Sequence, residues 1–182
     1  QVELPGGRRI KVKAGNMLLR FAAPSAAQLM SDAQGQLADI DMMLLWQSAE
    51  GRDEFGFVEL AQEYFGAEAG AMQQAATVLA LQQAPMYFYK RGKGRYRRAP
   101  EDALQAALAS IERKAREAEQ MEAWVLALAA GNAPPEIASQ WSQLLHAPDK
   151  QSLAYKALVA AADRARMSPV HLLARAKAIP ST

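Results

Sequence analysis

The spacing of apolar residues along the chain changes from a two-residue period to a period of three and four residues. Residues 8–13 alternate between apolar and basic side chains, which predicts a half-buried strand. Residues 2–4 and 16–21 are predicted strands too, and the Pro-Gly-Gly sequence at 5–7 is predicted to turn the chain between the first two. The sequence thus predicts a small β element over residues 1–23, too small to form a core unaided.

From Pro24 onward, apolar residues recur every three or four positions, which indicates helices. Ser25 is a predicted N-cap for a helix over Ala26–Met30, and Ser31 or Asp32 is a predicted N-cap for a second segment. Further helices are predicted over residues 37–49, 57–65 and 69–83.

Residues 86–98 form a predicted β-hairpin whose turn contains Gly92 and Gly94. We call this segment the basic hairpin. The order of helices followed by a hairpin over residues 24–99 is that of a winged helix-turn-helix domain. Gly66 falls at the turn before the last of these helices, where a positive φ is often required.

The second half of the chain is predicted to be helical throughout. Pro100 suits the first turn of a long helix that ends at Gly131-Asn132. Three more helices are predicted, over residues 135–146, over 150–166 and up to about Lys177, and Ser168 and Pro169 are predicted to cap the last of them. The expected fold is mainly α with a small β part, and residues 100–182 are expected to form a helical bundle of four members.

Composition narrows the class of protein. The chain contains no cysteine, which excludes disulfides and thiolate metal sites. It has neither a secretory leader pattern nor an apolar run of the roughly 18 residues that a membrane span needs. We therefore expect a cytoplasmic protein without a membrane partner.

Charge is concentrated in one place. Residues 1–85 carry 6 basic and 10 acidic side chains and residues 99–182 carry 9 of each, so the basic hairpin accounts for the net charge of +2. Its six cations and two of its tyrosines lie within ten positions. Such a cluster repels itself, and a polyanion relieves the repulsion.

Nucleic acid is the polyanion that this composition favours. Aromatic rings stack on bases and neighbouring cations bind phosphates, in a pattern that fits both RNA and DNA. Basic residues of the N-terminal strands are weaker candidates, because most basic strand faces are simply solvated. The candidate nucleic-acid-binding residues are Tyr89, Lys90, Arg91, Lys93, Arg95, Tyr96, Arg97, Arg98, Lys11 and Lys13.

No constellation in the chain predicts catalysis or a resident cofactor. His146 and His171 lack acidic or cysteine partners at ligand spacing, so structural or surface roles are favoured. Asp39 and Asp41 are more simply explained as acids near a helix N-terminus than as metal ligands. The predicted helix over 69–83 carries no cation, which is unusual for a helix that binds the major groove.

Several segments together resemble the N-terminal, non-catalytic region of a bacterial branch of the ribonuclease II family. The resemblance covers most of the chain and is strongest over the basic hairpin and its flanks. The segments that carry it are residues 13–21 (KAGNMLLRF), 53–57 (DEFGF), 61–66, 84–100 (APMYFYKRGKGRYRRAP) and 148–158 (PDKQSLAYKAL).

The resemblance implies a small β-barrel and a winged-helix region followed by a large catalytic domain. It also implies processive 3′-to-5′ hydrolysis of single-stranded RNA, with Mg²⁺ held by aspartates of that domain. The aspartate-rich motif is absent from these 182 residues, and the catalytic domain is expected beyond Thr182. This chain is therefore expected to have no nuclease activity and no cofactor, and to have RNA and its own catalytic domain as partners.

Two other functions stay open at this stage. A DNA-binding regulator fits the winged-helix pattern, although the third helix lacks Arg or Lys for contacts with base edges. A protein-interaction scaffold, in which the basic hairpin is incidental, is the other alternative.

Overall fold

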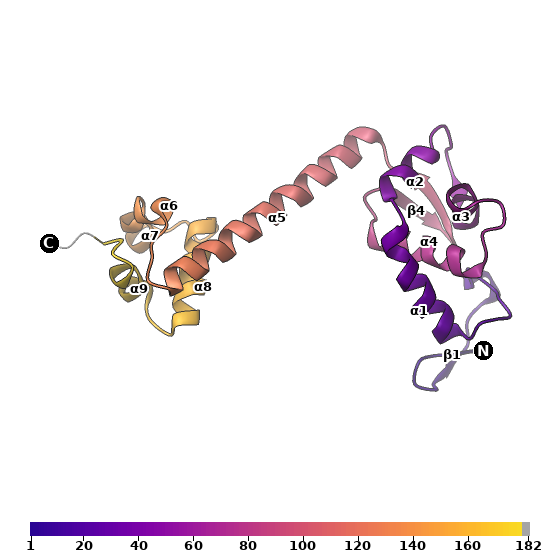
Figure 1. The fold of residues 1–182 in the computed structure, drawn as a ribbon, viewed down its shortest axis with the longest axis horizontal. Coiled ribbons are helices and arrows are strands. Elements are labelled where there is room, and N and C mark those ends of the chain that lie inside the picture. Colours follow the sequence, from indigo (N-terminus) through magenta and orange to yellow (C-terminus); the bar gives the residue numbers. More distant parts are fainter. Residues whose placement is uncertain (180–182) are drawn as a thin grey trace. The chain divides into compact units, whose positions relative to one another are not determined.

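The computed structural model describes residues 1–179, which are mainly helical and contain two small antiparallel sheets (Figure 1). This architecture confirms the coarse prediction of a mainly α fold with a small β part. The chain divides into two compact units, the first ending at Leu108 and the second beginning at Ala109.

The first unit begins with a two-stranded antiparallel sheet. Its strands β1 (Val2–Glu3) and β2 (Arg9–Ile10) are joined by the predicted turn, but β2 is shorter than the strand expected over 8–13. The strand expected over 16–21 is not observed. A single 3₁₀ turn, η1 (Ala14–Asn16), leads into this segment. No strand of the structure pairs with residues 16–21, so no sheet partner satisfies their backbone groups.

Three helical segments follow, with boundaries that differ from the predicted ones. They are α1 (Ala26–Gln36), η2 (Leu37–Asp39) and α2 (Met42–Ser48). Ser25 caps α1 as predicted, because its hydroxyl accepts a hydrogen bond from the Gln28 amide. The predicted N-cap at Ser31 or Asp32 is wrong, since α1 continues through both residues.

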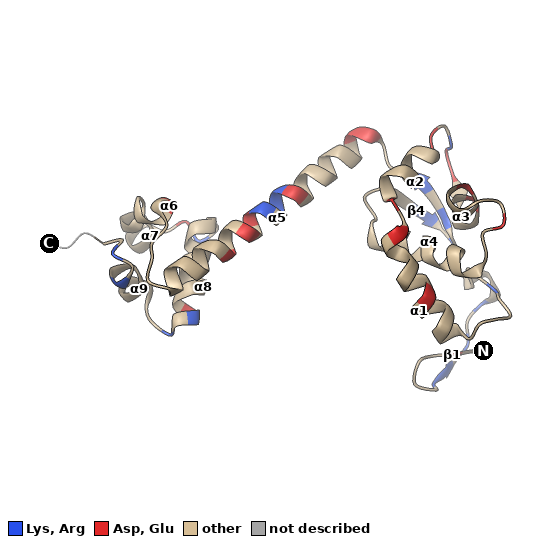
Figure 2. Cartoon of the chain, viewed as in Figure 1, with Lys and Arg blue, Asp and Glu red and all other residues tan. Residues whose placement is uncertain are grey.

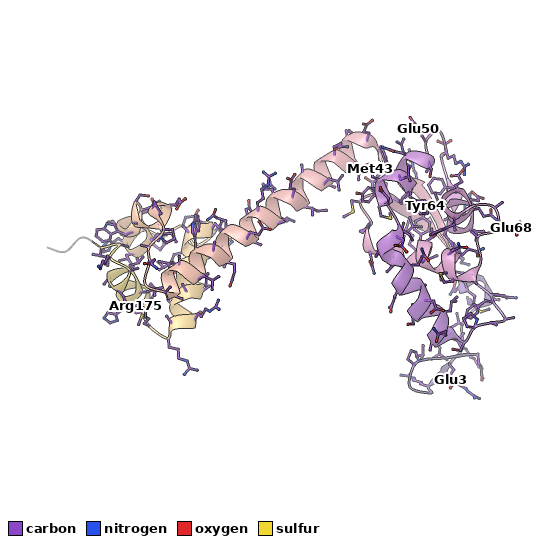
Figure 3. All side chains as sticks on the ribbon, viewed as in Figure 1. Glu3, Met43, Glu50, Tyr64, Glu68 and Arg175 are labelled. Carbon is purple, nitrogen blue, oxygen red and sulfur yellow. The ribbon has the colours of Figure 1, made fainter. Side chains whose placement is uncertain are left out.

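The helix expected over 37–49 is interrupted at Ile40 and Asp41. Asp41 Oδ1 accepts hydrogen bonds from the amides of Met43 at 2.9 Å and Leu44 at 3.1 Å, so it is the N-cap of α2. Tyr64 is labelled in Figure 3. Its hydroxyl accepts a hydrogen bond from the Asp41 amide at 2.8 Å and donates one to the Asp39 carbonyl at 2.9 Å. A tertiary hydrogen bond thus fixes the interruption.

The rest of the first unit combines two helices with a three-stranded sheet. Its elements are β3 (Phe55–Gly56), α3 (Phe57–Phe65), α4 (Ala71–Gln83), β4 (Phe88–Gly92) and β5 (Arg95–Arg98). The two helices and the hairpin lie where the sequence predicts them, and Gly66 has the expected positive φ of 101°. The two-residue strand β3 was not predicted. The sheet order is β3-β5-β4, with antiparallel neighbours.

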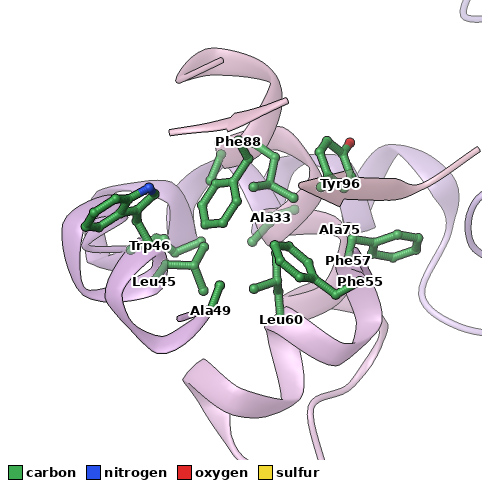
Figure 4. Packing of buried hydrophobic residues seen from close by; sticks show 14 of the residues in the cluster. Ala33, Leu45, Trp46, Ala49, Phe55, Phe57, Leu60, Ala75, Phe88 and Tyr96 are labelled. Atoms are coloured by element: carbon green, nitrogen blue, oxygen red, sulfur yellow. The ribbon is translucent and has the colours of Figure 1, made fainter. Parts of the chain in front are cut away.

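One hydrophobic core joins these helices to the sheet (Figure 4). Helix α4 packs against both α1 and α3. Phe55 of β3 and Phe88 of β4 are fully buried and meet edge to face, with ring centroids 5.7 Å apart. Leu19 packs against the same core, so residues 1–23 belong to the first unit and do not form a separate one.

Helix α5 (Glu101–Ala129) belongs to both units. Leu104 near its start is buried in the first core, and Val125 and Leu128 near its end are buried in the second. All residues from 111 to 120 are exposed, as in a helix stabilised by its own side-chain pairs, such as Arg116 with Glu112. The boundary between the two units therefore lies inside α5. The division into domains 24–99 and 100–182 that we expected from the sequence placed this boundary before the helix.

The second unit combines the end of α5 with four further helices. They are α6 (Pro135–Ala138), α7 (Trp141–His146), α8 (Leu153–Ala165) and α9 (Pro169–Arg175). The helix expected over 135–146 is divided in two, so the described part of this unit has five helices and not four. Ser168 caps α9 as predicted, and the Arg175 guanidinium donates to the Ala129 carbonyl at the end of α5 at 2.7 Å.

Candidate nucleic-acid interface

The strand register of the basic hairpin decides which of its side chains share a face. Tyr89 lies opposite Arg97, and Phe88 lies opposite Arg98. Because cross-strand partners point to the same side of a sheet, Tyr89 and Arg97 share the solvent face, while Phe88 points into the core. The hairpin therefore has one face whose aromatic rings enter the core and one face that combines an exposed aromatic ring with a cation.

The turn of the hairpin is held against the body of the first unit. Gly94 has a φ of 73°, and its carbonyl accepts a hydrogen bond from the Phe57 amide at 3.0 Å. A Cβ atom at Gly94 would lie 3.0 Å from the Phe57 ring and 3.3 Å from Leu18 Cδ2. Glycine is thus required here both by the backbone conformation and by the close packing.

Tyr96 was expected to stack on bases, and the structure corrects that assignment. It lies opposite Phe55 in the sheet and is only 3% exposed, so its ring is part of the core (Figure 4). Burial raises the pKa of its phenol above the ordinary value. Tyr89, by contrast, is 41% exposed and remains the one candidate stacking residue of the two.

Arg98 is also a structural residue. Its guanidinium carbon lies 3.5 Å from the centroid of the Trp46 ring, and its Nε donates to the Trp46 carbonyl at 3.0 Å. The Trp46 indole in turn donates to the Ala99 carbonyl at 2.9 Å. Because Arg98 is half-buried in these contacts, it is not available as a phosphate ligand in the way that we expected.

Arg95 is exposed but already paired. Its Nε lies 2.5 Å from Glu54 Oε1, in the loop that precedes β3. This hydrogen bond raises the pKa of the Arg95 guanidinium above its ordinary value. A phosphate would have to compete with Glu54 for this cation, so Arg95 is a weaker candidate than its neighbours.

Four cations of the basic hairpin remain exposed and make no ion pair with residues 1–179. They are Lys90, Arg91, Lys93 and Arg97, and we call them the four free cations. Blue segments of the hairpin strands are visible near the β4 label in Figure 2. Lys90, Arg91 and Lys93 surround the hairpin turn, while Arg97 lies next to Tyr89.

The N-terminal segment meets the hairpin at its turn. A Cβ atom at Gly15 would lie 3.1 Å from Lys93 Nζ, so the Lys93 side chain reaches over the backbone of that segment. Lys11 and Lys13 are exposed, and no ion pair of the described residues includes them. The segment that contains Lys11 and Lys13 therefore runs close to the turn of the basic hairpin, where Lys93 lies.

Helix α4 presents few polar groups to a ligand. Gln73 accepts from the Gly70 amide, Gln74 donates to the Ala69 carbonyl, and Thr77 donates to the Gln73 carbonyl. The helix carries no cation, and only its last two residues are exposed. These side chains are engaged with nearby backbone groups, which leaves little to contact base edges.

An acidic loop that we did not assign to the site borders the hairpin. Asp53, Glu54, Arg91 and Arg97 line one open depression, which we call the outer depression. Asp53 and Arg97 also line a second depression next to it. The resemblance included Asp53 and Glu54 in a shared segment but gave them no role, and only the pairing of β3 with β5 brings them to the hairpin.

Other candidate chemistry is sparse in residues 1–179. They contain no group of three or more His, Asp or Glu side chains arranged to hold a metal ion. His171 Nδ1 lies 3.1 Å from the capping Ser168 hydroxyl, which gives this histidine a local structural role. None of the helices in this range has the length and apolar character needed to cross a membrane.

Comparisons of the chain with protein-family models, with curated proteins and with solved structures found no match.

Proposed function

We propose that this chain is a single-stranded RNA-binding module of the winged-helix type, in which the basic hairpin is the wing. The order of α1, α3, α4 and the hairpin supports the winged-helix assignment, as does the pairing of β3 with β5. The observation that carries the functional proposal is the set of four free cations on the hairpin, one of which, Arg97, lies opposite the exposed Tyr89. Such an arrangement binds phosphates and stacks on an unpaired base.

Single-stranded RNA is favoured over duplex DNA by the character of α4. In winged-helix proteins that bind specific duplexes, this helix enters the major groove with side chains that contact base edges. Here three of its polar side chains are bonded to nearby backbone groups, and it has no cation. The resemblance to the N-terminal region of ribonuclease II-type exoribonucleases points to RNA as well. In that setting the module guides RNA to a Mg²⁺-dependent catalytic domain beyond this chain.

The proposal is tested by fluorescence anisotropy with matched single-stranded RNA, duplex RNA and duplex DNA across a salt series. We expect a preference for single-stranded RNA and a steep dependence on salt. A variant with all four free cations changed to Gln should lower the salt slope by about 2 to 3, since each phosphate contact on a single strand contributes about 0.7.

The matched control removes the same charge from the second unit. Lys114, Lys150, Lys156 and Lys177 are exposed and form no ion pair within residues 1–179, so their change to Gln should leave the slope unchanged. An equal loss in both variants would mean that only net charge matters. No binding to any of the three nucleic acids would favour the protein-interaction scaffold, and a preference for duplex DNA would favour the regulator.

A further inference from the structure

The outer depression contains charges of both signs that do not pair with one another. Asp53, Arg91 and Arg97 all line it, yet no hydrogen bond or ion pair within residues 1–179 involves any of their side chains. Glu54, the fourth lining residue, uses one carboxylate oxygen for Arg95. The depression thus has guanidinium donors and carboxylate acceptors that are free to bind a ligand.

A phosphate is a poor match for this combination. It would satisfy Arg91 and Arg97, but Asp53 and Glu54 would repel it. A ligand that satisfies all of these groups must present hydrogen-bond donors and acceptors on different edges. Nucleobases have this property, and phosphates and carboxylates do not.

Among the four RNA bases, guanine is the best match. Its Watson–Crick edge carries two neighbouring N–H donors, which a single carboxylate accepts together. Its O6 and N7 atoms are the acceptors to which arginine donates in pairs. Adenine, cytosine and uracil lack the two neighbouring donors, so a carboxylate gains only one hydrogen bond from each of them.

Tyr89 provides the apolar surface that a base also requires. It lies directly opposite Arg97 on the solvent face of the hairpin, and it is 41% exposed. A base that stacks on this ring has its edges close to Arg97, which lines the outer depression. Stacking alone accepts any base, so the choice among bases falls to the charged groups beside it.

We propose that the outer depression binds a guanine base of single-stranded RNA, with Asp53 accepting from N1 and N2 and Arg97 or Arg91 donating to O6 and N7. This inference rests on the proposed RNA-binding function and gives it a base preference. Tyr89 stacks on the same guanine or on its neighbour in the strand. The remaining cations bind the flanking phosphates.

The test compares three RNA probes on the whole chain by fluorescence anisotropy. One is a uridine oligonucleotide of about 12 residues, the second has a single central guanosine, and the third has inosine at that position. We expect the guanosine probe to bind about tenfold more tightly than the uridine probe, the effect of one bidentate pair. Inosine lacks the N2 amino group, so its probe should fall between the two.

Asp53→Asn is the informative variant. It should reduce the preference for guanosine several-fold, because the contact with N1 and N2 is lost while the arginine contact remains. The uridine probe should bind equally well or better, because a negative charge near the phosphates is gone. Glu68→Gln is the matched control: it removes one charge from an exposed residue of the same unit and should keep the preference. Circular dichroism checks that both variants are folded.

Three outcomes would overturn the inference. Equal binding of the three probes by the unchanged protein would leave RNA binding intact and remove the guanine site. If Asp53→Asn bound all three probes more tightly than the unchanged protein, and by the same factor, the role of Asp53 would be purely repulsive. No binding of any probe would overturn the proposed function along with the base preference.

Discussion

The Arg98 guanidinium lies over the ring of Trp46, 3.5 Å from its centroid, while the preceding residue in the strand, Arg97, points to solvent without an ion-pair partner among residues 1–179. Two consecutive arginines therefore have different roles. Arg98 connects β5 to α2, and Arg97 belongs to the candidate interface. The pair provides a control within the hairpin itself.

Replacement of Arg98 by Gln should mainly affect stability. The variant loses the contact with the Trp46 ring and the hydrogen bond to the Trp46 carbonyl, so its free energy of unfolding should fall by about 2 kcal/mol. Arg97→Gln should change that free energy by less than about 0.5 kcal/mol and should weaken RNA binding. Urea unfolding and anisotropy measure the two effects. The reverse pattern would contradict our assignment of the two residues.

Tyr89 and Tyr96 provide a second contrast, this time in RNA binding. Tyr89→Ala should weaken binding of single-stranded RNA about tenfold, which corresponds to the loss of one stacked base. Tyr96→Phe keeps the buried ring and should leave the affinity unchanged. If Tyr96→Phe weakened binding as much as Tyr89→Ala, the buried position of Tyr96 would be wrong.

The buried phenol of Tyr96 should make the first unit sensitive to alkaline pH. Burial raises the pKa of Tyr96 in the folded state above the ordinary 10.0. Below that value both states are protonated and the stability is fully present, whereas at higher pH the unfolded state ionises first and stability falls. Near-ultraviolet circular dichroism should therefore record unfolding of Tyr96→Phe at a higher pH than that of the unchanged protein. Coincident midpoints would count against burial of this phenol.

The Asp41 cap should contribute measurably to the stability of the first unit. Its carboxylate accepts from two amides at the start of α2, so Asp41→Ala should lower the free energy of unfolding by about 1 kcal/mol. Asp41→Asn retains a side-chain acceptor, so it should lower the free energy of unfolding by only about 0.3 kcal/mol. Urea unfolding of both variants provides the measurement, and equal losses would show that charge, not capping, is responsible.

Several elements could be predicted because their determinants are local. The segment 57–65 has a helical pattern that ends at a glycine, and Ser25 and Ser168 precede helices that they cap. The hairpin was predicted from its glycine turn between two short strands. The prediction of a strand over 16–21 was wrong, because a strand also needs a neighbouring strand to pair with, and the structure provides none for this segment.

The candidate site was predicted in part. Its location and its charge follow from composition, because six cations in nine positions stand out in a chain that is otherwise nearly balanced. The individual roles did not follow. Asp53 and Glu54 lie more than thirty residues before the hairpin, and nothing in their spacing indicates that the loop folds against Arg95 and Arg97.

The sequence alone was enough to predict most of the helices, the caps at Ser25 and Ser168 and the position of the basic hairpin, since these depend on residues a few positions apart. Tertiary structure decided which face of the hairpin is buried. Alternation in a strand defines two faces, but only the packing of Phe55 and Phe88 against the helices selects the one that becomes core. That choice buries Tyr96, ties Arg98 to Trp46 and leaves Tyr89 and Arg97 in solvent.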